Sequence, residues 1–477
     1  MTNTYDLAVI GGGSAGLTAA FIAGRVGAKT ILIDKEQLGG DCTHYGCIPS
    51  KSLIRCAKVA HTARQAERYG VRVPHVEVDY GRVAAYVREA ISTVESHETP
   101  EILTQQGVEV AFGGARFVSP TRIRVGEREI EATRSILAVG SHASSPSIPG
   151  LAAVGAIDHV GLFELTELPR RIVVLGAGPI GMEMGQALAR LGAEVIILQR
   201  GPRILRRDDA ELSQLLEGYV RKELRLVCDA TVLEAQAANG NKAIVFEVNG
   251  HQETLVCDEI MVAVGRRPNL AGLGLGEAGV AFNERGVIVD AKLRTTVRNI
   301  WACGDCAGSL QFTHFAEVQA RVAARNALFA GSQNFEDRST PWVTFTDPEL
   351  AHVGMTEAEA ARMGKKFEVY RYPYERLDRA ICEGETKGLA KLVTTPRGKI
   401  LGASILGPRA GEAITEIVIA MRAGITIQKL SSFVHPYPVM NRIIRRLGDE
   451  RFMARGVGTL SQRFFGRYKG DTNSTHR

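Results

Sequence analysis

The sequence predicts an α/β protein with two Rossmann-like domains. Two glycine-rich turns, each between an apolar strand and a helix, begin at positions 11 and 176 and indicate two nucleotide-binding units. The length of 477 residues exceeds one ordinary domain and is typical of about three. A hydrophobic content of 45% with 51 glycines is typical of a globular α/β protein rich in tight turns.

The first nucleotide unit occupies residues 4–34. An apolar strand at residues 5–10 leads into a helix through a G-x-G-x-x-G turn, and a second strand at residues 29–33 ends on Asp34. The glycines of the turn are Gly11, Gly13 and Gly16. They permit a tight turn and the close approach of the backbone to a pyrophosphate, which rests on the helix N-terminus. Asp34 is placed to bond a ribose hydroxyl.

Two cysteines follow this unit directly. Residues 39–51 read GGDCTHYGCIPSK, so four residues separate Cys42 from Cys47. If the segment starts a helix, the two side chains are about one turn apart and can close a small disulfide where the geometry allows it. A disulfide so close to a bound dinucleotide is rarely structural in a reducing cell. We therefore expect a redox-active pair that exchanges electrons with a flavin; a metal-binding or inert pair is the alternative.

The second nucleotide unit repeats the pattern of the first. Residues 171–175 and 194–198 are apolar strands, with a glycine turn and a helix between them. The glycines are Gly176, Gly178 and Gly181.

These motifs resemble the pyridine nucleotide-disulfide oxidoreductases, the flavoprotein group of dihydrolipoyl dehydrogenase, glutathione reductase and mercuric reductase. The active-site pattern of the group is GG-x-C-x4-C-x-P-[ST]-K, which residues 39–51 match, and the resemblance covers nearly the whole chain. It implies FAD in the first unit and a nicotinamide nucleotide in the second. Electrons would pass from NAD(P)H to FAD and to Cys47, which stacks under the flavin, and Cys42 would attack the acceptor.

Other cofactor contacts are implied by the resemblance alone. Lys51 would pair with Glu183 beside the flavin ring, and Asp305 would contact the ribityl chain. Further positions at the cofactors are Gly40, Gly140 of the second FAD segment, Gly265 of a G-R-x-P-N segment, and Ala316 of a T-H-F-A-E segment. The usual Thr of the second FAD segment is Val139, and the tyrosine that gates the nicotinamide pocket falls at Pro179, so the gate is absent or differently built.

The second unit favours NADPH over NADH. Gln199 stands where an NAD-preferring unit carries an acid, and Arg200 and Arg206 match arginines that hold the 2′-phosphate in NADPH-using relatives. A carboxylate would repel a phosphate, whereas a guanidinium pairs with it bidentately. The alternative is a solvated basic loop.

The resemblance also sets the domain boundaries: two Rossmann-like dinucleotide-binding domains plus an α+β C-terminal dimerisation domain. We expect a discontinuous FAD-binding domain at residues 1–150 and 278–339, an NAD(P)H-binding domain at 151–277, a dimerisation domain at 340–465 and a basic tail at 466–477. The arginine-rich stretch at about 443–469 is read as a solvated helix, with a membrane-surface or partner contact as the alternative.

The C-terminal motif departs from the family. Family disulfide reductases carry H-x-H-P-T-x-S-E, in which a histidine held by the glutamate is the acid/base of the interchange thiol and reaches the other subunit's cysteine pair. Here residues 435–442 read HPYPVMNR, and we assign Tyr437 to the position of the catalytic histidine and Arg442 to that of the glutamate. A phenol with a pKa near 10 is a poor base at pH 7. His435 stays near enough to serve if the loop is shifted.

Mercuric reductases have a Pro-Tyr pair in this region, as here, but also a terminal cysteine pair, whereas this chain has no cysteine after Cys382. We therefore expect poor turnover of lipoamide and glutathione disulfide, and better turnover of metal ions, quinones or a dedicated protein disulfide. A flavoprotein that delivers electrons to a protein partner or a quinone, with the disulfide secondary, is the alternative function. A redox-inactive binding subunit is disfavoured by the intact cysteine pair.

The composition argues against several other classes of protein. A net charge of +6 and a pI near 8.9 do not indicate nucleic acid binding. The N-terminus has no basic region before an apolar segment, and no apolar run reaches the length of a membrane span, so we expect a cytoplasmic protein. The resemblance implies that it is a homodimer. Eight irregularly spaced cysteines form no disulfide framework. Cys303 and Cys306 are expected to be packed thiols, with a second redox pair as the alternative, and no resident metal is expected.

Overall fold

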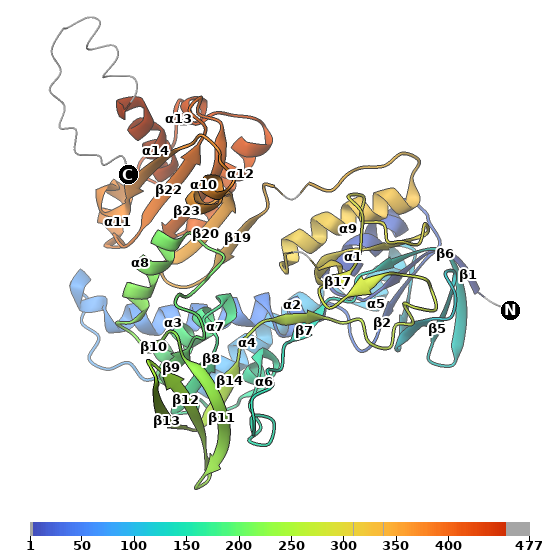
Figure 1. Ribbon diagram of the computed structural model, residues 1–477, viewed down its shortest axis with the longest axis horizontal. Coiled ribbons are helices and arrows are strands. Elements are labelled where there is room, and N and C mark those ends of the chain that lie inside the picture. The colour runs from blue at the N-terminus through green and yellow to red at the C-terminus, as the bar shows by residue number, and fades with distance from the viewer. Residues whose placement is uncertain (1–2, 309, 337, 455–477) are drawn as a thin grey trace, which may run out of the picture. The chain divides into compact units, whose positions relative to one another are not determined.

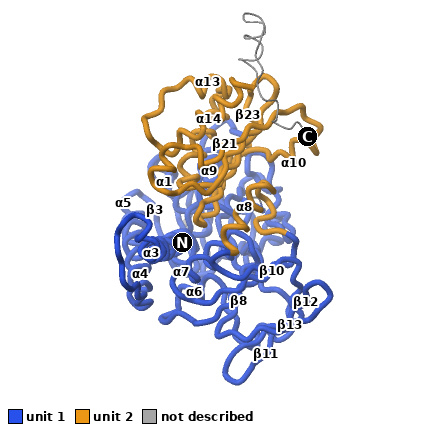
Figure 2. The backbone as a smooth tube through the Cα atoms, turned by 90° about the vertical axis from the view of Figure 1, so that its left-hand side faces the viewer, with its two compact units in different colours: residues 1–202, 222–336 blue, residues 203–221, 337–477 orange. Residues whose placement is uncertain are grey.

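The computed structural model describes residues 3–308, 310–336 and 338–454 (Figure 1). It divides into two compact units (Figure 2). Unit 1 takes in residues 1–202 and 222–336, and unit 2 takes in residues 203–221 and 337–477.

The larger sheet of unit 1 has seven strands in the order β3-β2-β1-β6-β5-β4, with β18 also paired to β6. Pairing is parallel except for the β4-β5-β6 hairpins. The strands are β1 (Asn3–Ile10), β2 (Thr30–Asp34), β3 (Val108–Phe112), β4 (Ala115–Phe117), β5 (Arg122–Val125), β6 (Arg128–Leu137) and β18 (Ile300–Ala302). This arrangement confirms the strands predicted at 5–10 and 29–33 and the short strands predicted within 108–140.

An apolar cluster covers each face of this sheet. Because successive side chains of a strand point to opposite faces, one strand contributes to both clusters. Leu7 and Val9 of β1 pack into one apolar cluster with α1 (Ser14–Arg25) and α9 (Thr313–Leu328). The two helices lie side by side (Figure 1). Ala8 and Ile10 enter a second cluster on the other face.

The second sheet of unit 1 is parallel, in the order β10-β9-β8-β14, and α7 (Pro179–Leu191) packs against it. Its strands are β8 (Arg171–Leu175), β9 (Glu194–Leu198), β10 (Arg225–Val227) and β14 (Glu259–Val262). This sheet confirms the strands predicted at 171–175 and 194–198. An antiparallel meander of β11 (Thr231–Ala238), β12 (Asn241–Val248) and β13 (His251–Cys257) follows β10.

The remaining elements of unit 1 are helices of various lengths and short strands. The helices are α2 (Gly40–His44), α3 (Cys47–Arg64), η1 (Ala66–Tyr69), α4 (Tyr80–Glu95), α5 (Pro100–Gln105), α6 (His159–Glu164) and η2 (Gly304–Ala307). The strands are β7 (Ser141–Ala143), β15 (Arg266–Pro268), β16 (Phe282–Asn283) and β17 (Gly286–Val287). The helices predicted within residues 52–100 are α3, α4 and the start of α5.

Unit 2 is a five-stranded antiparallel sheet, in the order β19-β20-β23-β22-β21, with helices packed on it. The strands are β19 (Pro341–Thr344), β20 (Glu349–Gly354), β21 (Glu368–Pro373), β22 (Leu389–Thr394) and β23 (Ile400–Gly407). The helices are α8 (Ala210–Val220), α10 (Glu357–Arg362), η3 (Tyr374–Arg376), α11 (Asp378–Glu383), α12 (Ala410–Arg422), α13 (Ile427–Ser431) and α14 (Arg442–Phe452).

A buried ion cluster explains why the segment with α8 belongs to unit 2. The ammonium group of Lys391, on β22, lies 2.9 Å from Asp209 and from Glu211 and 2.7 Å from Glu357. The Lys391 side chain is only 5% exposed. Because a buried ammonium is tolerated only when it is paired, this cluster holds the start of α8 on the sheet.

No helix in the described ranges has the length and apolar character that a membrane span needs. The predicted basic tail at 466–477 and most of the arginine-rich stretch lie outside the described residues.

Candidate active site

The first glycine turn forms a cradle at the start of α1. Gly11 has a φ of +105°, and a Cβ there would lie 2.3 Å from the carbonyl oxygen of Ala138. A Cβ on Gly16 would lie 1.7 Å from the carbonyl oxygen of Gly11. Gly13 caps α1 without any side-chain hydrogen bond, so the helix start suits an anion that accepts hydrogen bonds from its backbone N–H groups. These features fit the pyrophosphate of a dinucleotide.

The second glycine turn has the same geometry. Gly176 also has a φ of +105°, and a Cβ on Gly181 would lie 1.9 Å from the carbonyl oxygen of Gly176. Gly178 caps α7 without a side-chain hydrogen bond, and a Cβ there would meet nothing within 4 Å. The second cradle therefore fits a dinucleotide pyrophosphate as the first one does.

The residue at the end of the second strand is a carboxylate in the first nucleotide-binding unit and a neutral amide in the second. The carboxylate of Asp34 accepts a hydrogen bond from the backbone N–H of Gly12 at 2.6 Å. In the second unit the amide oxygen of Gln199 accepts from the N–H of Ala177 at 3.0 Å. Gln199 thus keeps the bond to the turn but brings no negative charge to the second cradle.

The arginines predicted at the 2′-phosphate belong to different units. Arg200 follows β9 in unit 1, and Arg206 lies in the segment assigned to unit 2. Both side chains are exposed. Their contact with a phosphate stays a prediction.

The redox motif begins at the first cradle and breaks into two helices. A Cβ on Gly40 would lie 2.8 Å from the α-carbon of Gly13, so the motif touches the cradle directly. Cys42 lies in α2, and Cys47 is the first residue of α3. The chain turns at Gly46, where a Cβ would lie 2.8 Å from the carbonyl oxygen of Asp41. The single helix start expected for this motif is therefore two consecutive helices.

Both cysteines are half-buried thiols that contact one hydroxyl group. The hydroxyl of Thr313, the first residue of α9, donates to the sulfur of Cys42 at 3.1 Å and lies 3.3 Å from the sulfur of Cys47. Thr313 was part of the predicted T-H-F-A-E segment, but nothing in that pattern assigned it to the thiols.

The pKa values of the two thiols are shifted in opposite directions. A hydrogen bond from Cys42 is the largest cause that lowers the pKa of Cys47, to about 6; burial opposes it, and Thr313 and the charge of Lys51 add to the lowering. The hydrogen bond with Cys47 and burial raise the pKa of Cys42. One proton is therefore held on Cys42, while Cys47 is a thiolate near neutral pH.

An ion pair lies one helical turn beyond Cys47. The ammonium of Lys51 donates to the carboxylate of Glu183, on α7, at 2.9 Å. The Glu183 side chain is only 7% exposed and that of Lys51 is 37% exposed. The structure thus brings Cys42, Cys47, Lys51 and Glu183 together in unit 1, although Glu183 is 132 residues from Lys51.

A polar network joins the redox motif to Asp305. Ser141 donates to the Asp305 carboxylate at 2.5 Å, and Arg266 donates to Ser141 at 2.8 Å. The guanidinium of Arg266 also lies 3.2 Å from the carboxylate of Asp41, which His159 contacts at 2.8 Å. Burial opposes ionisation of Asp41, yet the bonds from His159 and Arg266 lower its pKa. Sequence reasoning missed this network, because these residues come from separate segments.

The other predicted positions lie around this network. Gly265 directly precedes Arg266 and has a φ of +133°, and Gly140 has a φ of +66°. A Cβ on Gly304 would lie 3.3 Å from the Cβ of Ala316 on α9. Asp305 is part of η2, and burial raises its pKa.

Cys303 and Cys306 are fully buried thiols. Cys306 donates to the carbonyl oxygens of Cys303 and Leu137, at 3.2 and 3.4 Å. Burial raises the pKa of both thiols. This arrangement matches the predicted packed thiols, since a raised pKa suppresses the reactive thiolate.

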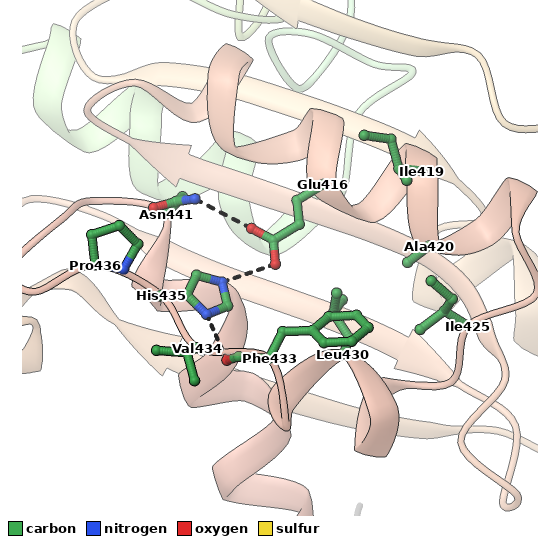
Figure 3. Close-up of a pocket in the computed structure, with 10 residues that line it drawn as sticks. All are labelled: Glu416, Ile419, Ala420, Ile425, Leu430, Phe433, Val434, His435, Pro436 and Asn441. Carbon is green, nitrogen blue, oxygen red and sulfur yellow. Dashed lines mark hydrogen bonds and ion pairs between the residues drawn. The ribbon is translucent and has the colours of Figure 1, made fainter.

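In unit 2, His435 is paired with a carboxylate (Figure 3). Its Nε2 lies 2.9 Å from Oε1 of Glu416 on α12, and its Nδ1 lies 3.1 Å from the carbonyl oxygen of Phe433. The pair lies on a groove of about 340 Å³ whose other lining residues are apolar apart from Asn441.

The assignment of Tyr437 to the position of the catalytic histidine, and of Arg442 to that of the glutamate, stays a prediction. His435, two residues earlier, is the side chain of this stretch that has a carboxylate partner. Tyr437 is 66% exposed, and the guanidinium of Arg442 lies 4.8 Å from its ring centre. The motif itself has lost its glutamate, but a carboxylate from another helix takes the place beside the imidazole. Sequence reasoning missed Glu416.

Comparison with known proteins decides the family. The pyridine nucleotide-disulphide oxidoreductase model matches residues 5–320, and the model of the dimerisation domain of these enzymes matches residues 340–447. The chain belongs to the pyridine nucleotide-disulphide oxidoreductase family. It is therefore a flavoprotein oxidoreductase of the class that uses FAD and NAD(P)H, and its dimerisation domain supports a homodimer.

Individual relatives are similar to this oxidoreductase over most of its length. A mercuric reductase of Bacillus cereus is 32% identical over 91% of this chain and 70% of its own length. A dihydrolipoyl dehydrogenase of Thermus scotoductus is 34% identical over 92% of this chain and 95% of its own. Among solved structures, the Cu(II) complex of the HOCl-induced flavoprotein disulfide reductase RclA from Escherichia coli has a TM-score of 0.83 and 29% identity, covering 94% of this chain and 99% of that one. These similarities confirm the predicted fold class and the flavoprotein disulfide oxidoreductase function.

Proposed function

We propose that this oxidoreductase passes electrons from NADPH, by way of FAD, through Cys42 and Cys47 to an acceptor. The observation that carries the proposal is the pair of thiols that share the Thr313 hydroxyl next to the Lys51–Glu183 ion pair. The raised pKa of Cys42 and the lowered pKa of Cys47 suit two different roles within one dithiol.

The cradles support two dinucleotides. Gly11, Gly13 and Gly16 with Asp34 would hold FAD, and Gly176, Gly178 and Gly181 would hold the nicotinamide nucleotide. When bound, FAD accepts a hydride and passes two electrons to a disulfide. The domain boundaries at 1–150 with 278–339, 151–277 and 340–465 follow from this assignment.

The chain's own residues have distinct roles at the thiols. Cys47, with its lowered pKa, would be the thiolate next to the flavin, and Lys51 would stabilise negative charge there. Cys42, which keeps its proton longer, would pass that proton to the departing group of the acceptor as its sulfur attacks. Glu183 holds the Lys51 ammonium in place.

NADPH is proposed over NADH because the second cradle has Gln199 where the first has Asp34. An amide keeps the bond to the turn and avoids repelling a 2′-phosphate. Arg200 and Arg206 are the proposed partners of that phosphate.

A soft metal ion is the second candidate acceptor besides a disulfide. Mercuric reductases are among the relatives, and RclA was solved as a Cu(II) complex. Two thiols that can both reach one ion are suitable soft ligands. No group of three or more His, Cys, Asp or Glu side chains that suits a resident metal occurs among the described residues. A quinone acceptor and a cytoplasmic location stay predictions.

Anaerobic titration with NADPH tests the core of the proposal. The parent enzyme should take up more than two electrons per subunit and develop a thiolate-to-flavin charge-transfer band. Cys47→Ser should abolish the band, whereas Cys42→Ser should show it without reductant. A flavin-free protein, or a band that ignores Cys47→Ser, would refute the assignment.

A further inference from the structure

We propose that Asp41 is a positioning residue that holds Cys42 within reach of Cys47, so that the dithiol closes readily to a disulfide. The proposal rests on the proposed function, because it concerns the redox equilibrium of the same cysteine pair. The family pattern GG-x-C-x4-C allows any residue at the position of Asp41, so the motif assigns it no role.

Cys42 lies on a helix that is too short to hold its own position. α2 has five residues, whereas isolated helices of fewer than about 12 residues are marginal in water. Its N-cap, Gly39, makes no side-chain hydrogen bond, and the chain turns at Gly46 before the next helix begins. Contacts with other elements must therefore fix α2, and Asp41, directly before Cys42, makes two of them.

The Asp41 carboxylate has a partner on each of its oxygens. Nε2 of His159 lies 2.8 Å from Oδ1, and the guanidinium of Arg266 lies 3.2 Å from Oδ2. Nη1 of Arg266 also lies 3.1 Å from the same Nε2, but a carboxylate can only accept, so the shorter contact requires the ring proton on Nε2. Hydrogen bonds to a charged group are about twice as strong as bonds between neutral groups.

The two partners of Asp41 belong to elements that are held by bonds of their own. Arg266 begins β15, which pairs with β7, and its guanidinium donates to the hydroxyl and to the carbonyl oxygen of Ser141 at 2.8 Å each. His159 begins α6, whose first turn is capped by the side chain of Asp158. The His159 and Arg266 side chains are only 6% and 12% exposed. Asp41 therefore ties α2 to two buried side chains from separate parts of unit 1.

A fixed Cys42 favours the disulfide over the dithiol. The two sulfurs lie 3.1 and 3.3 Å from one atom, the hydroxyl oxygen of Thr313, which keeps them close to each other. Groups that are held in place react at a high effective concentration, because they have little freedom left to lose. If α2 loosens, the open dithiol gains conformational freedom that it must give up again on closure, and the equilibrium moves toward the dithiol.

The test measures this equilibrium in the holoenzyme against anaerobic mixtures of reduced and oxidised dithiothreitol. Two electrons pass from the reagent to the enzyme, the Cys42–Cys47 bond breaks and the reagent closes to a cyclic disulfide. One proton of the reagent stays on Cys42, and the other goes to Cys47 or to the buffer, according to the pH. Alkylation of the free thiols after acid quenching, followed by mass spectrometry of the peptide with both cysteines, gives the reduced fraction without a signal from the flavin.

Two variants with opposite changes of charge separate position from electrostatics. Asp41→Asn removes a negative charge and keeps at most one of the two contacts, since an amide has a single acceptor oxygen. Arg266→Gln removes the positive charge that faces Asp41. Loss of position predicts a shift toward the dithiol in both variants, whereas a purely electrostatic effect on the thiolates predicts shifts in opposite directions. The matched control is Glu36→Gln, which removes the same charge as Asp41→Asn from a side chain that is 70% exposed.

Asp41→Asn and Arg266→Gln should each lower the equilibrium constant for disulfide closure about tenfold, because each loses a charge-assisted bond that fixes α2. For this two-electron couple a tenfold change raises the reduction potential by about 30 mV. Glu36→Gln should match the parent. If Arg266→Gln does not retain FAD, His159→Phe removes the other partner of Asp41 and should shift the equilibrium toward the dithiol as well.

A shift toward the disulfide in any of the three variants, or an equilibrium in Asp41→Asn that equals that of Glu36→Gln, would overturn the role of Asp41 alone. A parent enzyme that forms no Cys42–Cys47 disulfide even in oxidised dithiothreitol would overturn the proposed function as well.

Discussion

The acidity of Cys47 should depend on the hydroxyl of Thr313. This hydroxyl lies 3.3 Å from the Cys47 sulfur and 3.1 Å from the Cys42 sulfur, and it helps to lower the pKa of Cys47 to about 6. Thr313→Val keeps the shape of the side chain and removes the donor. A hydrogen bond to a charged group is worth about 1.5–3 kcal/mol, and a pKa difference of one corresponds to about 1.4 kcal/mol. At the lower bound, the pKa of Cys47 should rise to about 7.

The thiolate-to-flavin charge-transfer band of the partly reduced enzyme reports this pKa. Its absorbance should be titrated from about pH 5 to pH 9, and the midpoint should move upward by about one pH unit in Thr313→Val. The band is lost as the pH falls through the pKa, because only the thiolate gives it. At pH 6.5 the parent should therefore keep most of the band and the variant should keep the smaller part.

Thr43→Val is the matched control for this titration. Thr43 lies next to Cys42, but its hydroxyl donates to Glu98 at 2.9 Å and not to a sulfur. Its removal should leave the midpoint unchanged. A midpoint in Thr313→Val that coincides with that of Thr43→Val would refute the proposed contribution of the hydroxyl.

Four further predictions follow from the same structure. Steady-state kinetics should give a higher kcat/KM for NADPH than for NADH, and Arg200→Glu should reverse the order; equal use of both by the parent would contradict the phosphate assignment. Gly181→Ala should abolish NADPH binding in equilibrium titrations, since its Cβ would lie 1.9 Å from a carbonyl oxygen. Gly178→Ala should keep the fold, because a Cβ there meets no protein atom within 4 Å, but should also weaken NADPH binding, because the Cβ would occupy space that the pyrophosphate needs. Lys391→Met removes the ion-pair partner of the buried Asp209 carboxylate and should cost about 3–5 kcal/mol in urea unfolding; an unchanged transition midpoint would show that the cluster adds no stability. Sedimentation should find a dimer at working concentration, and a fully active monomer would be incompatible with an active site completed across subunits.

The sequence by itself determined the features that are local. The two cradles depend on glycines a few residues apart, and the first and third glycine of each lie where a Cβ would collide with a backbone carbonyl. Gly11 and Gly176 share the same φ of +105°. The apolar runs on either side of each glycine turn predicted the parallel strands, and the spacing of Cys42 and Cys47 indicated the redox pair. Each of these patterns is complete within a short stretch of chain, so one sequence suffices to recognise it.

Only the tertiary structure decided which distant side chains meet the local motifs. Thr313 reaches Cys47 from 266 residues away, and His159 reaches Asp41 from 118 residues away. Glu416 lies 19 residues from His435, on a helix of its own, and outside any motif that names a carboxylate. Such contacts arise because the packing of sheets and helices brings separate segments together. No periodicity or spacing in the sequence records that packing, so partners like these are found only once the chain is folded.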